Sequence, residues 1–204
     1  MNASRYINIT IRMATTDDAA AIAAIYAHYV QNTTISFEYD TPSVHEMSRR
    51  ITETLNKYPW LVCVRHEPHF EGQETLLGYA CAHTFFMRSA YQWDVELTIY
   101  MDQHHTGNGV GSLLYRTLFA ILKEQNIRNV YSLVTVPNPS SERLHQKFGF
   151  QSCGIWLQTG YKFEQWLDVQ VYSKSLGGHT CPPPPFRPLP TVDAKRIQEL
   201  LMRQ

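Results

Sequence analysis

Residues 103–111 read Gln103-His104-His105-Thr106-Gly107-Asn108-Gly109-Val110-Gly111, and this stretch organises the whole chain. An alternating apolar run, Val95 to Met101, precedes it, and an amphipathic run from Ser112 to Leu122 follows at once. This order predicts a strand, a glycine-rich turn and a helix. Glycines allow tight turns, and the free N–H groups at a helix start attract anionic oxygens. The turn therefore fits a phosphate seat, although such turns also serve as plain connections.

The composition is that of one main globular domain. The chain has 204 residues, of which 44% are hydrophobic and 12% aromatic, enough for a well-buried core. Lys plus Arg (18) balance Asp plus Glu (18), for a net charge of +0, which argues against nucleic acid or an acidic membrane as partner. No run approaches the roughly 18 apolar residues that span a bilayer. We expect a soluble, cytoplasmic protein that acts on a small molecule.

Strand and helix patterns alternate along the chain. Strands are expected at residues 7–13, 61–64, 76–82, 95–101, 130–136, 151–157 and 167–175, the second and third forming a hairpin through the loop Glu71-Gly72-Gln73. Helices are expected after the cap candidates at 15–18, from Pro42-Ser43 to about Lys57, from 112 to 122, and from Asn138 to Phe148-Gly149. These elements predict an α/β (α+β) fold, with a mixed central sheet and helices on both faces.

The composition changes at Gly177, so we divide the chain into a domain over residues 1–176 and a proline-rich extension over 177–204. Residues 181–188 are rich in proline and suit a stiff, extended segment. Thr191 is expected to cap a final helix that carries Ile197, Leu200 and Leu201 on one stripe. The extension either packs on its own domain or a sister subunit, or it recruits a proline-binding partner.

The cysteines and paired histidines do not indicate a metal or redox site. Cys63, Cys81, Cys153 and Cys181 are isolated from one another, and we expect buried free thiols. We find no carboxylate or cysteine near His104 and His105 at the spacing of a metal site. We therefore expect both histidines at the surface or beside a phosphate, and no bound metal.

Several segments together resemble the successive motifs of the GNAT acetyltransferase superfamily, and within it the phosphinothricin and methionine sulfoximine N-acetyltransferases. The segments are residues 36–38, 58–62, 88–91, 96–101, 106–111, 138–150 and 160–169. The resemblance covers residues 8 to 176 and implies a GNAT fold, acetyl-CoA as co-substrate and a homodimer. It also implies transfer of acetyl to the α-amino group of a small amino-acid analogue. Another small amine or amino acid, or a catalytically silent CoA-binding or dimeric interaction protein, stays open as an alternative.

The resemblance implies that main-chain groups hold most of the cofactor. Ile99, Tyr100 and Met101 would pair with the pantetheine amides, and Asn138, Ser141 and Lys147 would lie along the same arm. The pyrophosphate would sit on the turn and helix start formed by Thr106, Gly107, Asn108, Gly109, Val110, Gly111 and Ser112. Relatives usually begin this turn with glutamine or arginine, so Thr106 removes a long polar side chain.

Acyl transfer to an amine needs a base for the ammonium and an acid for the leaving thiolate. Glu96 interrupts an apolar strand, where burial would raise its pKa, and is the candidate base; an exposed strand face is the plainer alternative. His145 stands where many members of the family have a tyrosine, and the resemblance implies that it is the acid; a polar residue on a short helix is the alternative. Cys153 is set aside as an acyl carrier because no histidine is fixed beside it.

The resemblance also implies a set of residues around the acceptor. They are Phe37, Glu38, Phe86, Met87, Arg88, Tyr91, Glu96, Leu97 and Thr98. Arg88 could contact a carboxylate or phosphinate in two-point fashion, or be an ordinary surface arginine. Tyr161, Lys162 and Trp166 are expected to serve in packing more than in closing the pocket.

Overall fold

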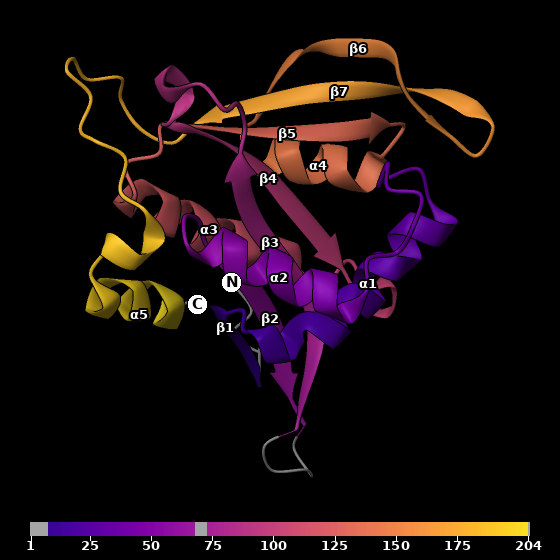
Figure 1. Ribbon diagram of the computed structural model, residues 1–204, viewed down its shortest axis with the longest axis horizontal. Helices are drawn as coiled ribbons and strands as arrows, with labels where there is room; N and C mark the ends of the chain where they lie inside the picture. The colour runs from indigo at the N-terminus through magenta and orange to yellow at the C-terminus, as the bar shows by residue number, and fades with distance from the viewer. Residues whose placement is uncertain (1–7, 68–72, 204) are drawn as a thin grey trace.

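The protein is described by a computed structural model that covers residues 8–67 and 73–203. Within those ranges it forms one seven-stranded mixed sheet (Figure 1). The strands are β1 (Ile9–Met13), β2 (Trp60–His66), β3 (Glu74–Thr84), β4 (Asp94–Met101), β5 (Asn129–Val136), β6 (Gln151–Lys162) and β7 (Gln165–Ser175). Their order across the sheet is β1-β2-β3-β4-β5-β7-β6, and only β4 and β5 are parallel neighbours. The predicted mixed sheet and hairpin are confirmed; Ile7, Glu71 and Gly72 lie outside the described residues.

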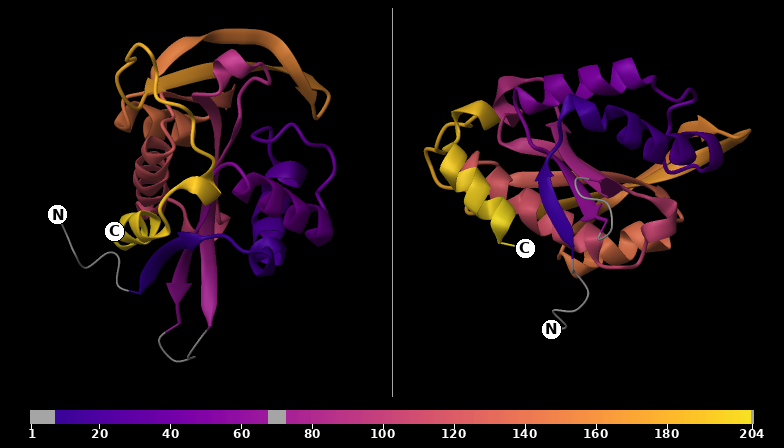
Figure 2. Two further views of the ribbon diagram at one scale, coloured as in Figure 1. Left: turned by 60° about the vertical axis from the view of Figure 1, so that its left-hand side comes forward. Right: turned by 90° about the horizontal axis from the view of Figure 1, so that it is seen from below.

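Helices cover both faces of the sheet, as predicted. One face carries α1 (Ala19–Asn32) and α2 (Val44–Leu55), and the other carries α3 (Val110–Glu124), α4 (Pro139–Lys147) and α5 (Ala194–Met202) (Figure 2). The three longest helices, α1, α2 and α3, turn buried apolar residues to the sheet, such as Ile22 and Ile25 on α1 or Leu114 and Leu118 on α3. Two separate cores result, one on each face. Among the described residues no helix has both the length and the apolar character needed to cross a membrane.

Local side-chain chemistry sets where the helices begin and end. Ser43 Oγ accepts a hydrogen bond from the Glu46 N–H at 3.1 Å and starts α2. Asn138 Oδ1 accepts from the Ser141 N–H at 3.1 Å and starts α4, and Gly149, with a φ of 71°, follows the helix end at Lys147 and its C-cap Phe148. These predicted caps are confirmed.

The cap predicted for the last helix was wrong. Asp193 begins α5, because its side chain accepts from the Lys195 N–H at 3.0 Å. The Thr191 hydroxyl instead donates to the Pro188 carbonyl at 2.7 Å, within a short 3-10 turn at Leu189–Thr191.

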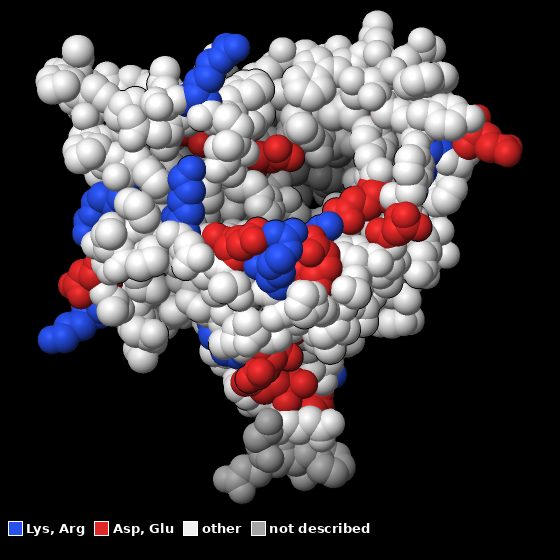
Figure 3. Space-filling view, viewed as in Figure 1, with Lys and Arg blue, Asp and Glu red and all other residues white. Residues whose placement is uncertain are grey.

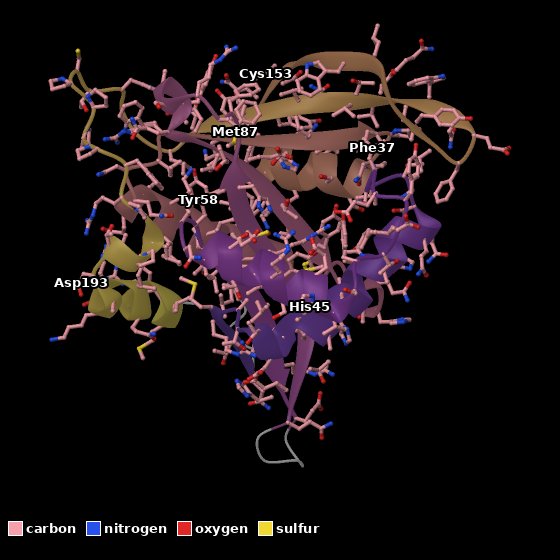
Figure 4. The ribbon with its side chains drawn as sticks, in the orientation of Figure 1. Phe37, His45, Tyr58, Met87, Cys153 and Asp193 are labelled. Carbon is pink, nitrogen blue, oxygen red and sulfur yellow. The ribbon has the colours of Figure 1, made fainter. Side chains whose placement is uncertain are left out.

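The proline-rich extension lies against its own domain, on the side where Figure 4 labels Tyr58 and Asp193. Phe186 packs on the Tyr58 ring at 5.5 Å, and Gln125 Nε2 donates to the Lys57 and Arg187 carbonyls at 2.7 and 2.9 Å. The apolar stripe of α5 joins the core beneath α3. Of the two roles considered for the extension, packing on its own domain is therefore observed, while the division after residue 176 stays a prediction.

Strand β6 departs most from the sequence-based expectation. It runs to Lys162 where 157 was expected, because its pairing with β7 shifts register between Ser152 and Gly154 and again between Trp156 and Gly160. Such irregularities break the alternation that marks a strand. Cys153 lies exposed on this strand (labelled in Figure 4) and Cys181 is exposed in the extension, so the prediction of buried thiols holds only for Cys63 and Cys81.

Candidate active site

The sheet splits between its two parallel strands. Ladder pairing of β4 with β5 covers only Asp94–Glu96 and Asn129–Tyr131 within the described chain, and the strands then diverge. The outer edge of β5 is paired with β7 along its length, and the outer edge of β4 is paired with β3. The facing edges therefore leave main-chain N–H and C=O groups free for a ligand lying between the strands.

A cavity of about 580 Å³ fills this split, and we call it the cleft cavity. Figure 3 shows the hollow in the upper half of the molecule, above the ion-paired side chains of α2. Ten residues predicted from the sequence line it: Phe37, Glu38, Glu96, Leu97, Thr98, Ile99, Tyr100, Asn138, Ser141 and His145. Residues from seven elements and the loop before α2 line this cavity among the described residues.

The glycine turn lies beside the cleft cavity, at the start of α3. Gly109 caps the helix with a φ of 84°, a conformation that other residues rarely adopt. The Val110 side chain is buried, so this part of the turn can offer a ligand only its main chain. Lys147 Nζ donates to Ser112 Oγ at 2.8 Å, which places a cation on the first turn of the helix. Free N–H groups, a helix dipole and a lysine together suit a phosphate group.

Not every residue of the predicted cofactor set faces the cleft cavity. Thr106, Gly107, Asn108, Gly109, Val110, Gly111, Ser112 and Lys147 form the neighbouring turn and its clamp. Met101 does not line the cleft cavity; its sulfur lies next to Gly111 of the turn, 3.9 Å from where a Cβ would stand, and its carbonyl accepts a hydrogen bond from the Tyr29 hydroxyl at 2.6 Å.

Glu96 stands at the closed end of the split. It pairs in register with His83 on β3 and is the last residue of β4 to pair with β5, opposite Tyr131. Its neighbours Val95 and Leu97 point into the α3-side core, so Glu96 faces the side of α1 and α2. Burial raises the pKa of Glu96 above its ordinary value. A half-buried carboxyl with a raised pKa is suited to accept a proton near neutral pH.

His145 is 1% exposed and lies inside an aromatic cluster. Its ring stacks on Tyr172 at 5.0 Å, and the Tyr115 hydroxyl lies 3.2 Å from Nε2. Nδ1 is 2.7 Å from the Ser141 carbonyl, so Nδ1 carries the proton and Nε2 accepts from the tyrosine. Burial lowers the pKa of His145, although the Ser141 carbonyl opposes that shift. The resting ring is therefore neutral.

The loop between α1 and α2 is clamped over the cleft by the β6–β7 hairpin. Lys162 Nζ donates to the Ser36 carbonyl at 2.6 Å. The Phe37 ring lies so close to Gly160 that a Cβ at residue 160 would come within 2.1 Å of it. Glu38 accepts from Arg50 at 2.7 Å and from the Tyr26 hydroxyl at 3.1 Å. Phe37 and Glu38 thus have fixed positions at the cavity wall.

Four predicted acceptor residues lie away from the cleft cavity. Phe86, Met87, Arg88 and Tyr91 belong to the β3–β4 connection and are exposed, Met87 by 92%. Phe86 packs on Tyr91 at 4.9 Å, and neither residue lines the cleft cavity. Within a single chain, Arg88 has the position of an ordinary surface arginine.

The structure adds wall residues that sequence reasoning missed. Tyr26, Tyr115, Trp156 and Thr159 line the cavity and were not among the predicted site residues. No local pattern marks them: Tyr26 and Tyr115 reach the cavity from helices α1 and α3, and Trp156 and Thr159 through the β5-β7-β6 order of the sheet.

The histidines before the glycine turn are tied to neighbouring side chains. His105 Nδ1 lies 2.9 Å from Asp102 Oδ1, a carboxylate nearby that the sequence argument had not counted. Across the described ranges, no group of three His, Cys, Asp or Glu side chains is placed to hold a metal ion.

Comparison with known proteins agrees with this geometry. Residues 11–171 match the model of the GNAT acetyltransferase domain. The chain is 32% identical over 184 residues to a phosphinothricin N-acetyltransferase of Streptomyces viridochromogenes, covering 90% of this chain and 96% of that one. It is 28% identical to an L-methionine sulfoximine/L-methionine sulfone acetyltransferase of Salmonella typhimurium, covering 85% and 98%. The solved phosphinothricin acetyltransferase of Sinorhizobium meliloti in complex with AcCoA is similar with a TM-score of 0.77 and 30% identity, over 92% and 97% of the chains.

Proposed function

This chain belongs to the GNAT family of acetyl-CoA-dependent N-acetyltransferases, and from that premise we propose that it acetylates the α-amino group of a small amino-acid analogue of the phosphinothricin or methionine sulfoximine type. The observation that carries the proposal is the split between β4 and β5, with Glu96 at its closed end. The free strand edges would hold the acetyl donor in the split. A carboxylate at the closed end would then lie next to the amine of the acceptor.

The residues present fit acetyl-CoA. The glycine turn and Lys147 suit its pyrophosphate, and the free edge of β4 at Leu97 to Tyr100 suits the amides of its pantetheine arm. Acetyl-CoA supplies an activated thioester. A main-chain N–H of β4 would donate a hydrogen bond to the thioester oxygen and stabilise the charge that develops there.

Glu96 is proposed to take a proton from the acceptor ammonium, which frees the lone pair that attacks. His145 is proposed as the proton source for the leaving thiolate, acting beside the Tyr115 hydroxyl. The lowered pKa of His145 restricts its protonated form to lower pH. His145→Gln tests this role: loss of an acid lowers kcat and removes a pH-dependent limb, whereas loss of packing lowers only the unfolding temperature.

A panel of acceptors with thiol-release detection tests the proposed function. Phosphinothricin, methionine sulfoximine and methionine sulfone should release CoA thiol with a lower KM than proteinogenic amino acids or simple amines. Release with a simple amine alone would favour the general small-amine alternative. Acetyl-CoA binding without release from any acceptor would favour the catalytically silent alternative.

We further propose a cytoplasmic homodimer that joins through the face of β6 and β7. Large apolar side chains of this hairpin are exposed, including Ile155 and Leu157 (74%) on β6, Phe163 in the turn and Trp166 on β7. Soluble monomers rarely expose such a set together. Trp156 and Thr159 of the same strand line the cleft cavity. Because side chains alternate along a strand, a partner packed on Ile155 and Leu157 would lie behind that cavity wall and support it. Light scattering after gel filtration should give twice the chain mass, and Leu157→Lys should give the monomer.

A further inference from the structure

A second cavity, of about 360 Å³, lies under α2 on the face of the sheet to which Glu96 points; we call it the α2 cavity. It shares Tyr26, Glu38, Thr98 and Tyr100 with the cleft cavity, so both border the same stretch of β4. A molecule with its amine at Glu96 therefore has room to extend past Thr98 and beneath α2.

One wall of the α2 cavity holds a buried donor for which the described ranges supply no partner. Trp60 is 3% exposed, and its Nε1 has no hydrogen-bond partner among the described residues. The ring is held in place, stacked on Tyr79 at 5.6 Å with its edge toward His83 at 6.2 Å. Buried donors are almost always paired in folded proteins, and the exceptions call for a missing partner. A hydrogen-bond acceptor inside the cavity is such a partner.

The remaining walls indicate what kind of group carries that acceptor. Tyr26, Tyr79, Tyr100 and Met47 supply apolar surface. The Arg50 guanidinium is already neutralised by Glu38 at 2.7 Å and Glu46 at 2.8 Å. Thr54, Thr98 and His83 add neutral polar groups, Glu38 and Glu53 add carboxylates, and the Arg50 cation is occupied. An apolar chain that ends in an uncharged oxygen fits this better than one that ends in a full anion.

We propose that the α2 cavity holds the side chain of the acceptor, with Trp60 Nε1 donating a hydrogen bond to an uncharged oxygen at its end. This rests on the proposed function and sharpens it, because it favours a sulfone-type side chain over the phosphinate anion. Trp60 then becomes a specificity residue.

Trp60→Phe tests the donor, since phenylalanine keeps an aromatic wall and removes only the N–H. Binding to the protein saturated with CoA is measured by titration calorimetry, with methionine sulfone and with methionine, which lacks the oxygens. We expect the Kd of methionine sulfone to rise about 10-fold and that of methionine to change less than about 2-fold. Equal changes for both ligands, or no change, would overturn the proposal. Trp93→Phe is the matched control, because the Trp93 N–H donates to the Pro184 carbonyl far from the cavity.

A second variant tests the space and does not touch Trp60. Thr54 lines the α2 cavity from α2, and Thr54→Phe would fill it. The Kd of methionine sulfone should rise at least about 10-fold, while alanine, whose side chain stops short of the cavity, should bind as before. Unchanged binding of methionine sulfone would overturn the proposal.

Calorimetry separates this inference from the proposed function, because binding needs no turnover. A wild-type protein that binds methionine sulfone through Trp60 but releases no thiol contradicts the function and supports the cavity assignment. A protein that acetylates methionine sulfone with no dependence on Trp60 or Thr54 contradicts only the assignment, and so does acetylation of phosphinothricin in preference to methionine sulfone.

Discussion

The two sides of β4 are built from different chemistry. On the cofactor side, the free strand edge and the turn at Gly107 to Gly111 offer main-chain groups, with Lys147 as a cationic clamp. On the acceptor side, Glu96, Glu38 and Trp60 offer side chains, each from a different part of the fold. Most substitutions leave the main-chain N–H and C=O groups in place, whereas a substitution at a side-chain binding site changes the groups that contact the ligand. The same fold can therefore keep one coenzyme and alter its acceptor.

The largest expected effect lies on the acceptor side. Glu96→Gln should lower kcat about 10²- to 10⁴-fold because it removes the proposed base. The Kd of acetyl-CoA should not change. In the wild type, kcat/KM should rise with pH through the raised pKa of Glu96, since the base works only when deprotonated, and this limb should vanish in the variant. Stopped-flow thiol release and equilibrium binding measure the two quantities. A variant that keeps the wild-type kcat would contradict the proposal that the Glu96 side chain acts as the base on the acceptor side.

The next effect concerns the stability of the acceptor wall. Burial lowers the pKa of His83 from 6.5 to about 4, so the unfolded chain binds a proton more readily than the folded protein. The stability linked to His83 is complete above pH 6.5 and falls as the pH drops toward 4. Between pH 7 and pH 5 this residue should remove about 2 kcal/mol from the free energy of unfolding.

Urea unfolding at both pH values measures that difference. His83→Gln should lose about 2 kcal/mol less than the wild type over the interval. His45→Gln is the control, because His45 is exposed on α2 (labelled in Figure 4) and lies outside both cavities. Identical losses in wild type and His83→Gln would show that the protonation of this partly buried ring does not change with unfolding.

A smaller effect is expected on the cofactor side, where backbone conformation matters. Gly109 has a φ of 84°, and a side chain there is unfavourable by about 1–2 kcal/mol. Gly109→Ala should raise the Kd of acetyl-CoA about 10-fold by displacing the turn, with acceptor affinity unchanged. Gly178→Ala is the control, since a Cβ there meets open space. If Gly109→Ala weakened acceptor binding as much as acetyl-CoA binding, the cofactor side and the acceptor side would not be independent binding sites.

The smallest effect sharpens the same contrast. Thr106→Ala removes a side chain from the turn but leaves every main-chain group, so the Kd of acetyl-CoA should change less than about 2-fold. Calorimetric titration with acetyl-CoA measures it. A rise in the Kd of acetyl-CoA as large as that expected for Gly109→Ala would mean that side chains, and not main-chain groups, bind the cofactor at this turn.

Much of the cofactor side could be predicted from the sequence, because its signals are local. The strand before the turn, the helix after it and the Asn138 cap follow from residues close in the chain, and the structure confirms them. The roles assigned to their site residues stay predictions. The resemblance to GNAT enzymes supplied the co-substrate, and the family match confirms that assignment.

The acceptor side could be predicted only in part. Glu96, Phe37 and Glu38 line the cleft cavity as expected, but the segment from Phe86 to Tyr91 lies elsewhere. The sequence did not identify Trp60 as lining the α2 cavity or Trp156 as lining the cleft cavity, because a tryptophan in a strand most often packs in the core. The register shifts of β6 interrupt the alternation of its side chains, so neither the length of the strand nor the exposure of Cys153 could be predicted from the sequence.

The amino-acid sequence by itself determined the element order, the glycine turn and a lone acidic residue in an apolar strand, because propensity and periodicity act over a few residues. Tertiary structure alone decided that β4 and β5 part after Glu96, that Lys162 reaches the Ser36 carbonyl, and that the Trp60 N–H beneath α2 meets no acceptor in the described part of the chain. Those contacts join residues far apart in the chain, and only the packing of the sheet and its helices brings them within a few ångströms.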